Sequence, residues 1–133
     1  MKGEDMCEKR PYSDRALKRG SALFGEKWAV DRLDDLAEWD EEYAQLFANY
    51  VYGGMYDREV LDQKTRELCA VAALVVLGRE VLAPHMRAAL RCGATSEEVA
   101  EVVFQMSVYG GFPATLAAIK TLKRVLDEEG QTG

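Results

Sequence analysis

His85 is the only histidine in the 133-residue chain, and it is the side chain best suited to proton transfer near neutral pH. The stretch VLAPHMRAALRCG predicts a helix whose first turn contains Pro84 and His85. A neutral imidazole at this place can accept or donate a proton, but it can also hydrogen-bond a carboxylate for structural reasons alone. The position by itself favours the structural role, so a catalytic His85 needs a chemically suitable partner.

Glu67 is the carboxylate with the most unusual surroundings. On a predicted helix over residues 62–78 it shares a face with Ala70, Val71 and Leu74, so its side chain projects from an apolar surface. Burying an unpaired carboxylate is costly. We therefore expect Glu67 either to pair with a cation, such as an arginine, or to line a pocket.

The three cysteines, Cys7, Cys69 and Cys92, are widely spaced and odd in number. They form neither a disulfide framework nor a metal-binding pattern, so we expect reduced thiols and no metal site. Cys69 is interpreted as a small core residue of an apolar helix. Cys92 shares a helix face with His85 but lies about 10 Å away along the axis.

Three polar residues are candidates for ligand binding. Arg66 adjoins Glu67 and could lie near the mouth of a pocket. Gln105 and Tyr109 are four residues apart on one predicted helix and could offer polar groups to a ligand. The alternative for Tyr109 is a half-buried aromatic ring with its hydroxyl at the surface.

The elements that must position these residues are helices. Amphipathic spacing and end signals predict about seven of them in residues 13–24, 26–39, 40–52, 62–78, 81–93, 95–109 and 112–129. A strand at residues 71–76 is the competing interpretation, and we reject it because the segment is alanine-rich and continues a helical pattern. We expect an all-α protein with a flexible tail (residues 1–11), one helical domain (residues 12–133) and a central, largely buried helix at 62–78.

Composition limits the classes of partner. The net charge of −6 argues against nucleic acid, which needs a basic surface, but it leaves room for a small anionic organic substrate in an arginine-containing pocket. No signal peptide is visible, and the longest apolar run, CAVAALVVLG, is too short to cross a bilayer. We expect a cytoplasmic protein that does not associate with membranes.

Four short elements occur in an ordered combination: KTRE at Lys64–Glu67, His85 with Arg87 two residues on, GAT with EE at Gly93–Glu98, and Gln105 through GGFPA to Ala114. This combination resembles the carboxymuconolactone decarboxylase family, which also contains the alkylhydroperoxidase D proteins. The resemblance extends over roughly two thirds of the chain, and the order of the elements is more specific than any one of them.

The resemblance implies an all-helical fold that assembles as a homo-oligomer, a trimer or hexamer. It also implies an active site between subunits near a glutamate and a histidine, which correspond to Glu67 and His85 here. The apolar last helix would then be part of the subunit interface.

Two activities occur in the family that this sequence resembles. The first is cofactor-free decarboxylation of a small lactone acid, 4-carboxymuconolactone, for which His85 would move the proton and Glu67 would orient it. The second is peroxide reduction by a CxxC pair just before the histidine, but Gly78 and Val81 stand at those two positions. We therefore expect a decarboxylase-like lyase. The alternatives are a thiol peroxidase with peroxiredoxin activity that uses Cys69 in a different geometry, and a non-catalytic member that binds or scaffolds.

Overall fold

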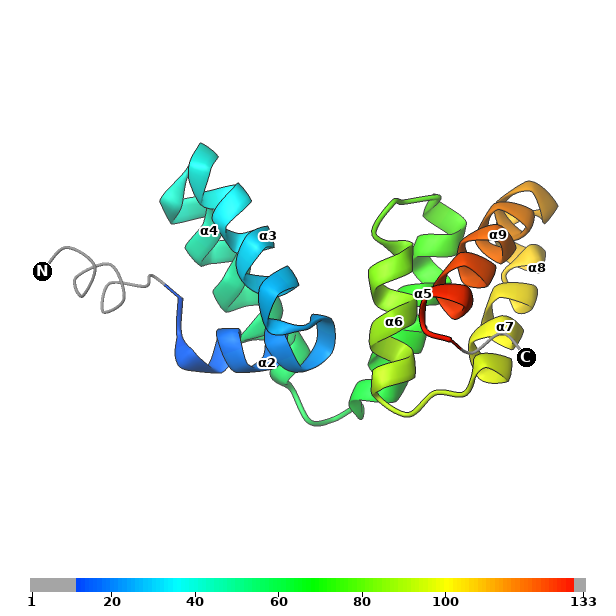
Figure 1. Cartoon of the computed structure of the whole chain (residues 1–133), viewed down its shortest axis with the longest axis horizontal. Coiled ribbons are helices and arrows are strands. Elements are labelled where there is room, and N and C mark those ends of the chain that lie inside the picture. Colours follow the sequence, from blue (N-terminus) through cyan, green and yellow to red (C-terminus); the bar gives the residue numbers. More distant parts are fainter. Residues whose placement is uncertain (1–11, 131–133) are drawn as a thin grey trace, which may run out of the picture. The chain divides into compact units, whose positions relative to one another are not determined.

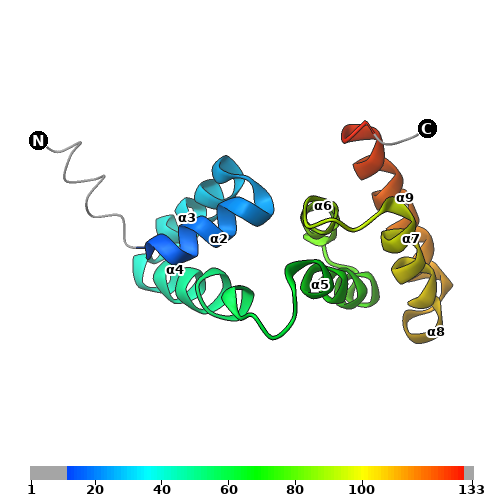
Figure 2. The same cartoon turned by 90° about the horizontal axis from the view of Figure 1, so that it is seen from below.

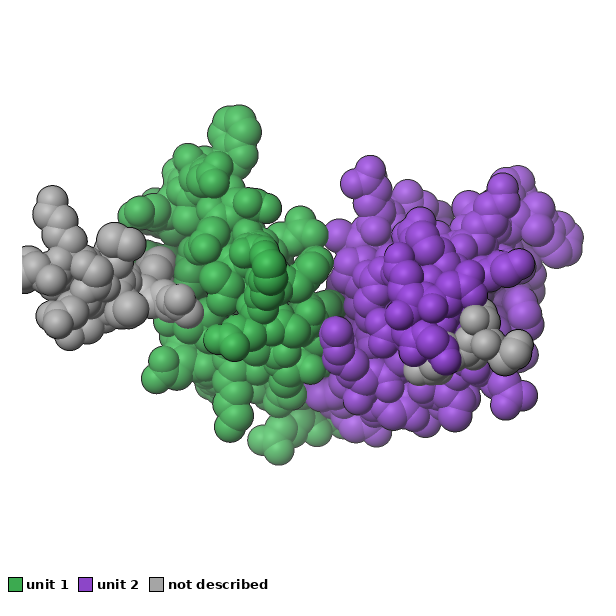
Figure 3. Space-filling view, viewed as in Figure 1, with its two compact units in different colours: residues 1–60 green, residues 61–133 purple. Residues whose placement is uncertain are grey.

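The computed structural model describes residues 12–130 of the chain, and these residues form helices and connecting turns without any β-strand (Figure 1). The all-α class predicted from the sequence is confirmed. The expected tail at residues 1–11 lies outside the described residues. The chain forms two compact units, residues 1–60 and residues 61–133, which are coloured separately in Figure 3.

Unit 1 is built from helices whose ends are set by polar caps and by glycine. The helices are α2 (Asp14–Phe24), α3 (Glu26–Trp39) and α4 (Glu41–Phe47), followed by the π-helical turn η1 (Ala48–Tyr52) and the 3₁₀ turn η2 (Met55–Asp57). The Ser13 side chain accepts a hydrogen bond from the Ala16 N–H at 3.1 Å, and the Asp40 side chain accepts one from the Tyr43 N–H at 2.9 Å. Gly25 separates α2 from α3, as the sequence predicted.

The core of unit 1 is small and tightly packed around Tyr52. This ring lies against Phe24 and Phe47, with ring centroids 5.9 and 5.5 Å apart, respectively. A Cβ atom added to Gly20 would lie 2.8 Å from the Tyr52 ring. Only glycine allows α2 to approach the aromatic ring so closely.

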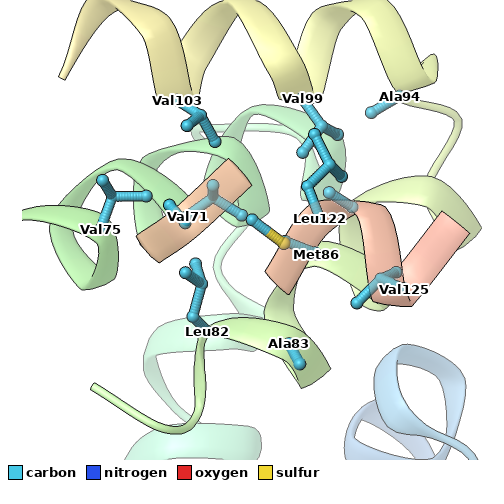
Figure 4. Close-up of a cluster of buried hydrophobic side chains, with 12 residues drawn as sticks. Val71, Val75, Leu82, Ala83, Met86, Ala94, Val99, Val103, Leu122 and Val125 are labelled. Atoms are coloured by element: carbon cyan, nitrogen blue, oxygen red, sulfur yellow. The ribbon is translucent and has the colours of Figure 1, made fainter. Parts of the chain in front are cut away.

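Unit 2 contains the segments that could carry chemistry. Its helices are α5 (Gln63–Leu77), α6 (Leu82–Arg91), α7 (Ser96–Gln105), α8 (Ser107–Gly110) and α9 (Phe112–Glu128). Figure 2 shows α5 and α6 side by side, with α7, α8 and α9 on one side of this pair. A buried cluster fills the space between the helices (Figure 4); it includes Val71 and Val75 of α5, Met86 of α6, Val99 and Val103 of α7, and Leu122 and Val125 of α9.

Two expectations about these helices were wrong. The predicted helix over 95–109 is divided at Met106, where α7 ends and the short α8 begins. The Met106 N–H is shared between the carbonyl oxygens of Val102 and Val103. Helix α5 was expected to be buried on most sides. Its fully buried residues instead form one narrow stripe, Glu67, Val71 and Val75, because they recur at four-residue steps along a single face.

Candidate active site

Helices α5 and α6 form a hairpin that is closed by local signals. The Asp62 side chain accepts a hydrogen bond from the Thr65 N–H at 2.7 Å, and this bond holds the pKa of the Asp62 carboxyl below its usual value. Gly78 ends α5 in the left-handed conformation (φ 66°), which glycine adopts without steric cost. Helix α6 begins at Leu82, after a short connection. The two helices pack along each other.

The hairpin brings Glu67 and His85 into direct contact. The distance from Glu67 Oε1 to His85 Nδ1 is 2.6 Å. The Glu67 side chain is completely buried, whereas 16% of the His85 side chain is exposed. Of the two outcomes expected for Glu67, pairing is the one that the structure shows, and its partner is the histidine rather than an arginine.

The short contact determines what each nitrogen of His85 can do. A carboxylate can only accept hydrogen bonds, so with Glu67 in this form the contact requires the His85 tautomer in which Nδ1–H donates to Glu67 Oε1. Nε2 is then the ring atom on which proton exchange with a ligand would take place. The second carboxylate oxygen, Oε2 of Glu67, is buried and has no hydrogen-bond partner among the described residues.

The pair lies beside apolar side chains. Val71 follows Glu67 on the buried stripe of α5. Leu82, Ala83 and Met86, which flank His85 in the sequence of α6, belong to the buried cluster drawn in Figure 4. A hydrogen bond between a carboxylate and an imidazole is stronger in such surroundings than in water. The geometry suits a proton donor and acceptor that is held rigidly by its carboxylate.

Arg66 and Arg87 each form contacts with residues outside the Glu67–His85 pair. Arg66 is half-buried, and its Nη2 donates a hydrogen bond to the backbone oxygen of Leu61 at 3.4 Å. Arg87 forms ion pairs with Glu128 and, at 4.0 Å, with Glu129. Arg87 therefore joins α6 to the end of α9.

Cys69 and Gln105 line a shallow hollow of about 210 Å³ between α5 and α7, together with Thr65, Leu68, Ala72, Val102 and Met106. The prediction that Cys69 is a core residue was wrong, because its side chain is exposed. Residues two apart on a helix point in nearly opposite directions, so the inward-facing Glu67 forces Cys69 outward. Tyr109 is not among the lining residues; it lies on α8 and is 70% exposed.

Thr65 and Met106 were missed as neighbours of Cys69 and Gln105. Thr65, Cys69 and Ala72 recur at spacings of four and three residues, which place them on one face of α5. This spacing could have identified the α5 side of the hollow. The α7 side could not be identified, because it depends on how the two helices pack.

Within residues 12–130, no three histidine, cysteine, aspartate or glutamate side chains gather in a way that could hold a metal ion. The same part of the chain contains no helix of sufficient length and apolar character to span a membrane.

The comparison with known proteins identifies the family of the chain. Residues 41–124 match the model of the carboxymuconolactone decarboxylase family, and the chain belongs to this family. Within it, the chain is 30% identical over 117 residues to the 4-carboxymuconolactone decarboxylase of Acinetobacter baylyi, with 87% of each chain covered.

Two further relatives extend the comparison. An uncharacterized 15.0 kDa protein of Paracoccus denitrificans is 41% identical over 83 residues, which cover 60% of this chain and 62% of the relative. The nitrosuccinic acid decarboxylase of Metarhizium robertsii is 23% identical over 122 residues, which cover 90% of this chain and 84% of the relative. The relatives with a named activity are thus both decarboxylases.

Proposed function

We propose that the protein is a cofactor-free carboxy-lyase that removes carbon dioxide from a small organic acid. The observation that supports this function best is the 2.6 Å contact between a fully buried carboxylate, Glu67, and the partly exposed His85. The family and its two decarboxylase relatives support the same kind of reaction.

The proposed reaction breaks the bond between the substrate's carboxylate carbon and the adjacent carbon. Carbon dioxide leaves, and the bonding electron pair moves onto the remaining carbon and into a neighbouring electron-withdrawing group. His85, as the imidazolium, then delivers the Nε2 proton to that carbon. Glu67 accepts a hydrogen bond from the Nδ1–H throughout the reaction. It thereby orients the ring and stabilises the imidazolium before the Nε2 proton is transferred.

The substrate class that we propose is a small anion with a carboxylate near a lactone or nitro group. The names of the two decarboxylase relatives denote substrates of this class. A positively charged or polar side chain is needed to hold such an anion, and we propose Arg66, Gln105 and Tyr109 as substrate-binding candidates. Cys69 and Cys92 form no disulfide, which is compatible with a reducing compartment, and we propose that the protein acts in the cytoplasm.

The test is turnover of 4-carboxymuconolactone and of nitrosuccinate, measured as release of carbon dioxide and as the change in ultraviolet absorbance. Wild type would be compared with His85→Gln and Glu67→Gln. The matched control is Glu101→Gln, which makes the same chemical change at an exposed position of α7.

We expect kcat to fall by about a hundredfold or more in both site variants and to stay unchanged in Glu101→Gln. Circular dichroism and thermal unfolding would show that the variants are folded. Activity at the wild-type level in both His85→Gln and Glu67→Gln would refute the roles assigned to these two residues. A folded wild type without activity on either acid would refute the proposed substrate class.

The same preparations distinguish the thiol peroxidase alternative. Peroxide reduction with a dithiol would require a cysteine, and Gly78 and Val81 occupy the two positions of the peroxidase pair. Peroxide turnover lost in Cys69→Ser but kept in His85→Gln would favour this alternative over the lyase.

A further inference from the structure

Helix α2 has one strongly basic side. Arg15, Lys18 and Arg19 lie on this side, and Ala22 continues it three positions later, because residues three and four apart share a helix face. The chain as a whole carries a net charge of −6, so such a local gathering of cations is unusual for it. Like charges at these spacings destabilise a helix, and an anion close to them removes this cost.

Asp57 of the turn η2 supplies one negative charge to the basic side of α2. Its Oδ2 accepts a hydrogen bond from Arg15 Nε, and its Oδ1 accepts one from Arg19 Nε at 3.1 Å. The hydrogen bond from Arg15 is the main cause that holds the pKa of the Asp57 carboxyl below its ordinary value, so this group is ionised at neutral pH. One carboxylate offers about four acceptor positions, whereas two guanidinium groups carry about ten N–H donors, so most of these donors remain for a second anion.

A hollow of about 360 Å³ lies beside these residues in unit 1, and we name it the α2 hollow. Its lining residues are Arg15, Lys18, Arg19, Ala22 and Asp57. Three positive charges and one negative charge give the lining a net charge of +2. Lys18 is exposed and forms no ion pair within residues 12–130, so its ammonium group is available to a ligand.

We propose that the α2 hollow binds a dianionic phosphate group, either free phosphate or the phosphate of a small monoester. A phosphate monoester carries a charge of about −1.5 to −2 at pH 7, which matches the net charge of the lining. Guanidinium groups bind phosphate oxygens through paired N–H donors, and the Lys18 ammonium adds a mobile point charge. Asp57 already orients Arg15 and Arg19 before a ligand arrives, so binding costs less side-chain entropy.

The size and lining of the hollow limit the ligand further. A volume of about 360 Å³ lies at the lower end of the range for ligand sites, roughly 300–1,000 Å³, so any organic group attached to the phosphate is small. Of the five lining residues only Ala22 is uncharged, so recognition depends on charge and hydrogen bonds rather than on apolar contact. The hollow belongs to unit 1 and the Glu67–His85 pair to unit 2, and the phosphate site is therefore proposed independently of the decarboxylase function.

The first experiment titrates the full chain with inorganic phosphate, glycerol 3-phosphate and succinate by isothermal titration calorimetry at pH 7. We expect at least one of the two phosphate compounds to bind with a dissociation constant of about 1 mM or lower. Succinate is expected to bind about tenfold more weakly, because its two charges lie on separate carboxylates and only a phosphate concentrates both on one centre. Tighter binding of glycerol 3-phosphate than of inorganic phosphate identifies a monoester as the ligand, and the reverse order identifies free phosphate.

The second experiment locates the site with variants. Arg15→Gln and Lys18→Gln each remove one cation from the lining and are each expected to raise the dissociation constant about tenfold. Ala22→Phe keeps every charge but fills the hollow, and it is expected to weaken binding at least as much. The matched control is Lys27→Gln, which makes the same change as Lys18→Gln at an exposed position of α3 outside the hollow, and it is expected to bind like wild type. Circular dichroism would confirm that helix content is unchanged in each variant.

Three results would overturn the proposal. The first is a folded wild type that binds neither phosphate compound at a ligand concentration of about 10 mM, tenfold above the expected dissociation constant. The second is succinate binding as tight as phosphate binding, which would show a site for anions in general. The third is binding that Lys27→Gln weakens as much as Lys18→Gln, or that Ala22→Phe leaves unchanged, because either result would show attraction to diffuse surface charge rather than to the α2 hollow.

Discussion

Glu67 Oε1 lies 2.6 Å from His85 Nδ1, although the two residues are eighteen positions apart and belong to different helices. The contact places a carboxylate in the core of unit 2, where leucine or valine would pack at lower desolvation cost. A glutamate at such a position is typical of a functional site rather than of a helix interface selected for stability.

The first prediction concerns the energetic cost of this pair. Replacing both residues by apolar ones, Glu67→Leu/His85→Phe, is expected to leave the free energy of unfolding unchanged or to raise it by about 1–4 kcal/mol. Glu67→Leu alone is expected to lower it by about 1–3 kcal/mol, because the imidazole loses its acceptor. Urea unfolding of the two single variants and the double variant measures both effects.

The same double-mutant cycle gives the interaction energy between the two side chains. The contact does not couple Glu67 to His85 if the change in the free energy of unfolding of the double variant equals the sum of the changes in the two single variants.

The second prediction concerns the core of unit 2. Met86 has no exposed surface and lies within the buried cluster of α5, α6, α7 and α9. Met86→Ala is expected to lower the free energy of unfolding by about 2–5 kcal/mol, because it removes buried apolar surface and leaves a cavity. Met55→Ala, at a position that is 40% exposed, serves as the control and is expected to change it by less than about 1 kcal/mol.

The third prediction concerns acid stability at the start of α7. The backbone N–H of Thr95, and then Lys64 at 3.0 Å, hold the pKa of the Glu98 carboxyl below its ordinary value of 4.5. A lowered pKa in the folded state stabilises the fold above the unfolded-state pKa, and this contribution disappears as the pH falls through the folded-state pKa. The stability advantage of wild type over Glu98→Gln is therefore expected to be complete at neutral pH and to vanish in acid.

Chemical unfolding measured between about pH 3 and pH 7 follows this difference. Glu101→Gln is the control, because its carboxylate is exposed and the cap of α7 is formed by Thr95 and Glu98 instead. A Glu98→Gln difference that stays constant with pH would contradict the assigned cause.

The fourth prediction separates thiol reactivity from the proposed reaction. Cys69 is exposed, whereas Cys92 is only partly exposed. Brief alkylation followed by mass spectrometry is expected to modify Cys69 before Cys92. Cys69→Ser is expected to keep wild-type decarboxylation, and a large loss of kcat in this variant would instead place the thiol in the reaction.

The helix ends were the most predictable part of the fold. The helices predicted over 13–24, 62–78 and 95–109 begin at Ser13, Asp62 and Thr95, and the structure shows these three residues as helix caps. Thr95 forms the complete capping box with Glu98. Gly78 ends α5 in the left-handed conformation. These features depend on a few neighbouring residues, which is why a sequence read without a structure can locate them.

The inward faces of the helices were harder to predict. In α9, the apolar residues Leu116, Ile119, Leu122 and Val125 recur at helical spacing, but Leu116 and Ile119 are exposed in the structure. Both sides of the first half of α9 are apolar, so periodicity alone cannot distinguish the core from the surface. The Glu67–His85 pairing was equally inaccessible to spacing, because it depends on the packing of α5 against α6.

The hairpin of α5 and α6 has a kinetic consequence. Glu67 and His85 lie within one stretch of chain that two adjacent helices and a short connection complete, so their contact closes only a short loop. Contacts of such low sequence separation form early and quickly in folding. The contact between Glu67 and His85 can therefore form early in folding, before the other helices of unit 2 have packed against α5 and α6.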